Sequence, residues 1–153
     1  MVGGDVSQAR IYEWLAGVPD PEIPVLSILD LGIVRDVNVS NGVTVTLTPT
    51  YSGCPATEAI EASVLDALRE RGVADVSVRR VLSPPWTTDW ISDEGRRKLK
   101  RYGIAPPTPA KDVHCPRCES SSVECISEFG STACKASWRC CDCLEPFELF
   151  KCL

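Results

Sequence analysis

Four cysteines near the C-terminal end of the chain have the spacing of a metal-binding site. They form two Cys-x-x-Cys pairs, Cys115 with Cys118 and Cys140 with Cys143, and 21 residues separate the pairs. Two intervening residues allow both sulfur atoms of a pair to face one ion about 2.3 Å away, and two pairs complete a tetrahedral site. The spacing therefore predicts a structural zinc ribbon. Rubredoxin-like iron is the alternative metal, because four thiolates accept either ion.

Two neighbouring residues bear on the choice of ligands. Cys141 could replace Cys140, but the two-residue spacing to Cys143 favours Cys140. His114, the only histidine, precedes the first pair, and we expect it to have a capping or solvent-facing role because as a ligand it would have to displace a thiolate. Disulfides are the competing interpretation of the cysteines. The N-terminus lacks a signal-peptide pattern, and a cytoplasmic protein with nine cysteines most often uses them for metal or redox chemistry.

Cys134 and Cys152 form a candidate second thiol pair. If the second Cys-x-x-Cys pair is the turn of a hairpin, pairing Arg139 with Pro146 or Phe147 is expected to place Cys134 opposite Cys152. Cross-strand partners lie about 5 Å apart, which suits a disulfide or a shared metal. The alternative is two small buried thiols in the core of the ribbon.

The ninth cysteine, Cys54, stands alone before a predicted helix. Pro55 suits the first helical position, so Cys54 is the approximate N-cap, where the helix dipole favours a thiolate. No histidine is near as a base, so binding of a soft metal fits better than a protease-like nucleophile. The alternative is a small buried hydrophobic residue.

A proline-rich loop offers carboxylates that could join Cys54. Asp20 and Glu22 lie between Pro19, Pro21 and Pro24, whose rings hold the loop in a fixed direction. If this loop folds over the start of the helix, a thiolate and one or two carboxylates converge. The alternative is a pair of exposed turn residues.

Periodicity predicts the elements that position these residues. Helical spacing marks residues 6–18, 56–72 and 92–103; a hairpin turns at Asn41 and Gly42; and a further strand covers residues 74–81. The order helix, hairpin, helix, strand, helix predicts a small α+β sandwich. We expect a first domain over residues 1–103, a proline-rich linker at 104–112 and the zinc ribbon at 113–153.

Charge and composition exclude several classes of function. The net charge of −5 argues against a nucleic-acid binder, and the basic run from Arg96 to Arg101 fits a solvated helix face. No apolar run approaches the roughly 20 residues of a membrane span, so we expect a cytoplasmic protein. The chain contains no Glu-x-x-His pairs and no glycine fingerprint for a flavin or nicotinamide. It is therefore not expected to be an enzyme by itself.

Two segments of the first region resemble a known family. "DPEIPVLSILDLGIVRDV" at residues 20–37 and "LTPTYSGCPATEAI" at 47–60 resemble the SufT-like bacterial proteins and the eukaryotic cytosolic iron–sulfur targeting factors. The resemblance covers roughly residues 6–105. It implies a compact α+β fold, work in iron–sulfur protein maturation, a reactive cysteine at Cys54 and acidic loop positions at Asp20 and Glu22.

The C-terminal region resembles a more specific family. "HCPRC", "FGSTACK", "RCCDC" and "EPFELFKC", with "PPWTTDWIS" before them, look like the PaaD family of phenylacetyl-CoA epoxidase systems. This implies phenylacetate catabolism, with oxygenase and reductase subunits and the iron–sulfur assembly machinery as partners. Structural zinc and a transient iron or iron–sulfur cluster would be the cofactors. The alternatives are a purely structural subunit and a thiol redox or electron-transfer protein; exposed strand edges also permit a homodimer.

Overall fold

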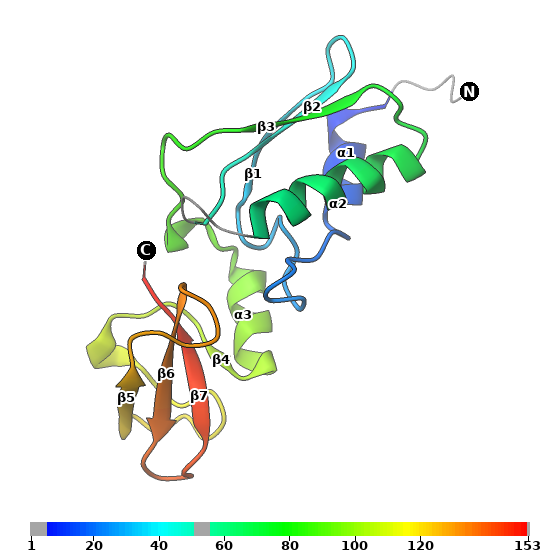
Figure 1. Cartoon of the computed structure of the whole chain (residues 1–153). Coiled ribbons are helices and arrows are strands. Elements are labelled where there is room, and N and C mark those ends of the chain that lie inside the picture. Colours follow the sequence, from blue (N-terminus) through cyan, green and yellow to red (C-terminus); the bar gives the residue numbers. More distant parts are fainter. Residues whose placement is uncertain (1–5, 51–55, 153) are drawn as a thin grey trace. The chain divides into compact units, whose positions relative to one another are not determined.

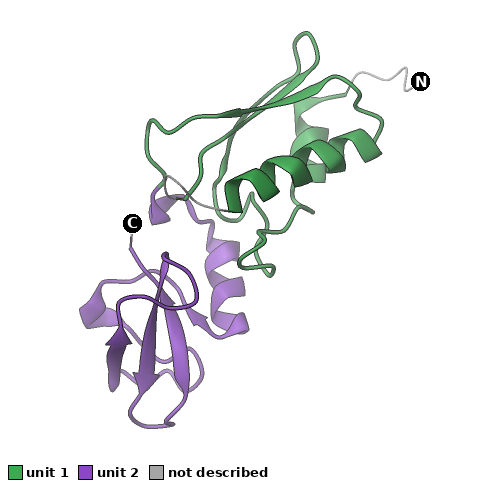
Figure 2. Cartoon of the chain, viewed as in Figure 1, with its two compact units in different colours: residues 1–86 green, residues 87–153 purple. Residues whose placement is uncertain are grey.

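The computed structural model describes residues 6–50 and 56–152 of the 153-residue chain. Cys54 and Pro55, the predicted N-cap and first helical residue, lie outside the described residues. The chain forms two compact units, residues 1–86 and 87–153 (Figure 2).

The first unit is a three-stranded sheet with two helices on one face (Figure 1). The order across the sheet is β1-β2-β3. The elements of this unit are α1 (Gln8–Leu15), β1 (Val34–Asn38), β2 (Val43–Leu47), α2 (Ala56–Glu70) and β3 (Val76–Arg80).

The alternation of side chains along β2 builds the core of the first unit. Val43, Val45 and Leu47 are buried while Thr44 and Thr46 between them are only half-buried. The helices add an apolar stripe each, because residues four apart share one helix face. These buried helix residues are Ile11 and Leu15 of α1 and Ile60, Val64 and Leu68 of α2.

The predicted hairpin is present, and its turn has the predicted backbone conformation. Asn41 and Gly42 have φ angles of 54° and 93°. Left-handed φ at both central positions is what an Asn-Gly turn supplies. A Cβ at Gly42 would displace the Asp75 carboxylate, and the φ of 93° is the main reason that this position favours glycine.

The pairing of β3 was not predicted. β3 runs parallel to β2, with Val43 opposite Val76 and Val45 opposite Val78. The chain therefore makes a strand–helix–strand crossover through α2, because parallel neighbours need a long connection.

The second unit is a four-stranded sheet preceded by one helix (Figure 1). The strand order is β4-β7-β6-β5; β4 is parallel to β7, and the other pairs are antiparallel. The elements are η1 (Thr88–Trp90), α3 (Asp93–Tyr102), β4 (Ile104–Ala105), η2 (Ala110–Asp112), β5 (Val123–Ser127), β6 (Lys135–Cys140) and β7 (Pro146–Phe150).

α3 begins and ends at the predicted residues. The Ser92 hydroxyl accepts the N–H of Gly95 at 2.9 Å, which caps the first turn, and Gly103 closes the helix with φ of 95°. The structure groups this helix with the ribbon, whereas the expected boundary lay at residue 103. Within the expected linker, Ile104 and Ala105 are buried and pair with β7.

Taken together, the elements confirm an α+β fold with a C-terminal ribbon. Among the described residues, no helix is long and apolar enough to cross a membrane.

Candidate metal centre

Four cysteine side chains converge in the second unit. They are the predicted set, Cys115, Cys118, Cys140 and Cys143, and their sulfur atoms all lie within 4.8 Å of one another. Cys115 Sγ is 3.7 Å from Cys143 Sγ, and Cys118 Sγ is 3.5 Å from Cys140 Sγ. A tetrahedral ion with 2.3 Å bonds separates its sulfur ligands by about 3.8 Å. The four thiols therefore fit one zinc or iron ion.

The two Cys-x-x-Cys pairs have the same backbone fold. In the first, the N–H of Cys115 donates to the Ser120 carbonyl at 2.9 Å; in the second, the N–H of Cys140 donates to the Glu145 carbonyl at 3.0 Å. Each loop reverses through a residue with left-handed φ directly after its last cysteine, Glu119 at 63° and Leu144 at 66°. The shared geometry presents each pair of sulfurs to the other.

Backbone N–H groups point at the sulfur atoms. Arg117 N–H donates to Cys115 Sγ, and Cys143 N–H donates to Cys140 Sγ, both at 3.4 Å. Such bonds favour a thiolate over a thiol, because the donor stabilises negative charge. The loops therefore prepare the sulfurs for a cation before one binds.

The thiols differ in how easily they ionise. The N–H of Cys143 lowers the pKa of Cys140 to about 7, against the effect of burial. The N–H of Glu145 acts to lower the pKa of Cys143, but burial and the neighbouring thiols outweigh it and raise that pKa to about 12. Once one thiolate forms, a second is disfavoured by like charge. A bound cation would offset the repulsion between the thiolates, so metal binding must release protons from the thiols.

Further bonds tie the first loop to the second. The Ser120 hydroxyl donates to the Asp142 carboxylate, and the N–H of Cys141 donates to the Ser122 carbonyl at 2.8 Å. The sulfur of Cys141 is not in the four-sulfur cluster, and its residue is exposed. His114 is also exposed, and its Nδ1 lies 2.8 Å from the Asp112 carbonyl, to which it donates. Among the described residues, neither side chain joins the cluster.

The register of the β6–β7 hairpin determines which residue lies opposite Cys134. Arg139 lies opposite Pro146, and the N–H of Lys151 donates to the Cys134 carbonyl at 2.8 Å. Lys151 is therefore opposite Cys134, and the expected position of Cys152 there differs by one residue. Cys134 and Cys152 themselves lie just outside β6 and β7. The second thiol pair stays a prediction.

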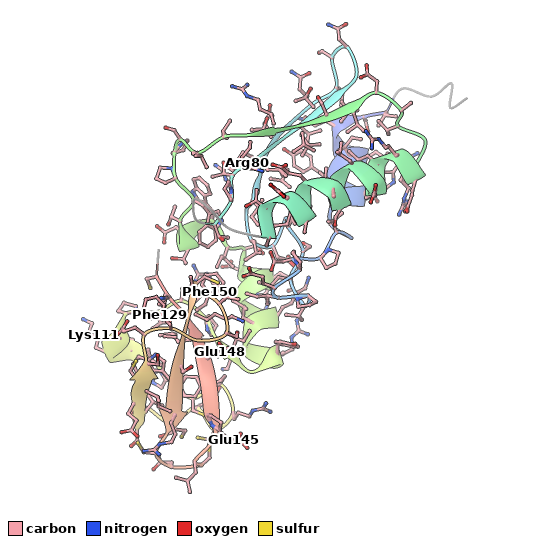
Figure 3. The ribbon with its side chains drawn as sticks, in the orientation of Figure 1. Arg80, Lys111, Phe129, Glu145, Glu148 and Phe150 are labelled. Carbon is pink, nitrogen blue, oxygen red and sulfur yellow. The ribbon has the colours of Figure 1, made fainter. Side chains whose placement is uncertain are left out.

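An ion pair between buried Lys135 and half-buried Glu148, which the sequence did not indicate, supports the loop between β5 and β6. Lys135 is only 4% exposed, and its Nζ lies 3.5 Å from Glu148 Oε1. Glu148, labelled on β7 in Figure 3, also accepts the N–H of Ser131 at 2.7 Å. Burial acts to raise the pKa of Glu148, but the Ser131 bonds and the charge of Lys135 outweigh it and hold the pKa below its usual value.

The acidic loop of the first unit has a defined shape. Asp20 is buried, and its Oδ2 accepts the N–H of Glu22 at 2.9 Å and the N–H of Ile23 at 2.7 Å. These bonds turn the chain at Asp20, but its burial differs from the exposed turn residue of the alternative interpretation. Glu22 is half-buried. Because Cys54 lies outside the described residues, convergence of these carboxylates with the thiol stays a prediction.

Comparisons with known proteins divide the chain into two modules. Residues 8–81 match the family of iron–sulfur cluster assembly proteins, and residues 102–151 match the PaaD zinc beta ribbon domain. Among solved structures, a domain of unknown function from Bacillus anthracis is 31% identical with a TM-score of 0.56, over 60% of this chain and 90% of that chain. A conserved hypothetical protein from Thermotoga maritima is 32% identical with a TM-score of 0.53, over 62% and 95%.

Curated relatives include proteins of both kinds. The Fe-S protein maturation auxiliary factor of Porphyromonas gingivalis is 38% identical over 61% of this chain and 90% of its own length. The PaaD-type 1,2-phenylacetyl-CoA epoxidase subunit of Escherichia coli is 48% identical over 94% of this chain and 92% of its own length. Identity at this level across both modules shows that the chain belongs to the PaaD family of phenylacetyl-CoA epoxidase subunits.

Proposed function

We propose that this chain is an accessory maturation factor of a phenylacetyl-CoA epoxidase system, acting in the cytoplasm on phenylacetate catabolism. It would assist iron–sulfur cluster assembly on the oxygenase or reductase. One observation carries the proposal. The epoxidase relative of Escherichia coli matches 94% of the chain, whereas the maturation factors of Porphyromonas gingivalis and Staphylococcus aureus match only 61% and 49% of it. The chain thus joins a maturation module to a ribbon that those factors do not cover.

In this proposal the first unit handles iron. Cys54 would hold iron or a cluster transiently, because a thiolate is the ligand that these species prefer. Asp20 and Glu22 would contribute a carboxylate or shape the loop beside the thiol. The two backbone bonds to Asp20 Oδ2 support a shaping role for that residue.

The ribbon would have a structural role in the same proposal. Cys115, Cys118, Cys140 and Cys143 would hold one zinc ion, which replaces the large core that so small a unit lacks. The ion would supply cross-linking and no chemistry. The chain would not be an enzyme, and its activity would be seen only in the metal content of its partners.

The test separates cluster assembly from a purely structural role. Cells that express the epoxidase system with Cys54→Ser should yield oxygenase and reductase subunits with less than half of the normal iron and acid-labile sulfide. The matched control is Cys125→Ser, an exposed cysteine of β5 outside the four-sulfur cluster. Full iron–sulfur occupancy and epoxidase activity in Cys54→Ser would favour the structural role.

Zinc, iron and sulfide per chain, measured after purification without oxygen, test the cofactors. One zinc with no iron supports a structural ribbon and a transient site at Cys54. Iron without sulfide in place of zinc would support the electron-transfer alternative. A reversible two-electron couple that disappears in Cys134→Ser or Cys152→Ser would support the thiol redox alternative. Light scattering of the same sample decides whether a homodimer forms.

A further inference from the structure

Four basic side chains gather on α3 and on the first cysteine loop. Lys100 and Arg101 follow Arg97 by three and four residues, so the three share one face of α3, with side chains 65% (Arg97), 50% (Lys100) and 69% (Arg101) exposed. Arg117 joins them from the loop between Cys115 and Cys118, because its Nη2 would lie 3.2 Å from a Cβ placed on Gly103. We call these four residues the α3 basic surface.

The basic surface keeps an excess of positive charge. Glu94 accepts from both Arg97 and Arg101, at 3.0 and 3.1 Å, and Glu119 accepts from Lys100 at 2.6 Å. Four cations against these two carboxylates and Asp112, which lines the adjoining cavity, leave +1, on a chain whose net charge is −5. Exposed ion pairs contribute only about 0–1 kcal/mol each, so an acidic partner can exchange with Glu94 and Glu119 at little cost.

A cavity adjoins this surface within the same unit. Its volume is about 430 Å³, and its lining combines the polar side chains of Lys100, Asp112, His114 and Glu119 with Cys115 and buried apolar residues. The apolar lining includes Ala105, Val113 and Leu149, which belong to the hydrophobic core of the ribbon. Sites of this size and lining take apolar groups. The cavity therefore offers a place for one large apolar side chain beside the cations.

The strand next to the cavity makes one mode of binding unfavourable. β4 pairs with β7 on one side only, so it is an edge of the sheet. Pro106 and Pro107 follow it directly and lack the N–H groups that an added strand would need. A partner would therefore be held here by side-chain contacts, with charge giving orientation and the apolar group giving affinity.

We propose that the α3 basic surface and the adjoining cavity bind an acidic segment of a partner protein, with one apolar side chain of that segment in the cavity. The charge excess selects the acidic residues, and the core-lined cavity selects the apolar one. This docking surface belongs to the second unit and does not depend on iron handling by Cys54. It would explain physically why a ribbon follows the maturation module.

The test uses the zinc-loaded full chain and a fluorescein-labelled synthetic peptide, Asp-Glu-Asp-Leu-Glu-Asp-Glu. Fluorescence anisotropy at low ionic strength should show binding that weakens with added salt. The Arg101→Gln/Arg117→Gln double variant should bind about tenfold more weakly, and replacing the peptide leucine by serine should also weaken binding about tenfold. The matched control is Arg139→Gln, which removes another ion-paired arginine with a 50% exposed side chain from β6 and should leave binding unchanged.

Each contrary result overturns the proposal. Absence of peptide binding up to about 1 mM means that no such site exists at useful affinity. Equal binding of the serine peptide, or of double-stranded DNA in place of the peptide, means that only non-specific charge is recognised. An equal effect of Arg139→Gln means that the position of the arginines is irrelevant. Loss of zinc in the double variant together with loss of binding means that these arginines serve the metal site instead.

Discussion

The sulfur atoms of Cys115 and Cys143 lie 3.7 Å apart although the two residues are 28 positions apart in the sequence. Cys115 belongs to the loop before β5, and Cys143 to the turn between β6 and β7. The strands of the ribbon bring these two loops together, and the four cysteine side chains cluster where the loops meet. We therefore expect metal binding and folding of this unit to be coupled, because the site does not exist in the unfolded chain.

Cys115→Ser tests this link between metal and fold. We expect zinc per chain to fall from about one to below about 0.1, and the thermal transition of the second unit to disappear. Cys141→Ser is the matched control, since its exposed thiol lies next to Cys140 but outside the four-sulfur cluster. Metal analysis and calorimetry measure both outcomes. A Cys141→Ser variant that loses zinc would show that the ligand set is wrong.

Two variants of Asp20 can separate a structural role of this residue from a chemical one. Asp20→Ala should destabilise the first unit by about 1–2 kcal/mol, because it leaves two backbone N–H groups of the loop without their acceptor. Asp20→Asn keeps an acceptor oxygen and should cost less than about half of that. Urea unfolding measures the stability of both. If Asp20→Asn is stable but abolishes iron–sulfur delivery, the charge of Asp20 is needed, and its role exceeds shaping the loop.

Glu148 gives the second unit a pH-dependent stability. Its pKa is lowered in the folded state. The stabilisation is therefore present above the unfolded pKa of about 4.3 and is lost as the pH falls through the folded pKa. Glu148→Gln leaves buried Lys135 without its countercharge and should cost about 1–3 kcal/mol at pH 7.

Urea unfolding of the wild-type chain and Glu148→Gln from pH 7 down to pH 3 measures this contribution. The difference between them should shrink below about pH 4. Glu124→Gln is the control, because its partner Arg139 is half exposed and the pair should contribute under about 1 kcal/mol. A difference for Glu148→Gln that does not change with pH would contradict the ionic explanation.

Replacing Leu144 tests whether the backbone of the second Cys-x-x-Cys loop is strained. Its φ of 66° is costly for a residue with a Cβ, and its side chain is 70% exposed, so little packing compensates. Leu144→Gly should leave stability unchanged or raise it by up to about 1 kcal/mol. Leu82→Gly, at another exposed leucine without left-handed φ, should instead lower the thermal transition of the first unit. Opposite signs in calorimetry are the expected result.

Much of this protein could be predicted from local sequence. The two Cys-x-x-Cys pairs, the Asn-Gly turn and the Ser92 and Gly103 ends of α3 each depend on a few consecutive residues whose chemistry fixes their geometry. The periodicity of the helices and strands was enough to predict the α+β class. The left-handed residues Glu119 and Leu144 were missed, because neither is a glycine, the usual signal for that conformation.

Only the tertiary structure shows how strands pair and which elements pack together, because these features depend on residues far apart in the sequence. The parallel pairing of β2 with β3, the grouping of α3 and β4 with the ribbon, and the register that puts Lys151 rather than Cys152 opposite Cys134 follow from packing between segments far apart in the sequence. A register shift of one residue exchanges the faces of a strand but hardly changes its composition, so no local pattern reveals it. The sequence by itself determined which thiols can bind a metal; only the folded chain decided which charged and apolar side chains stand beside them.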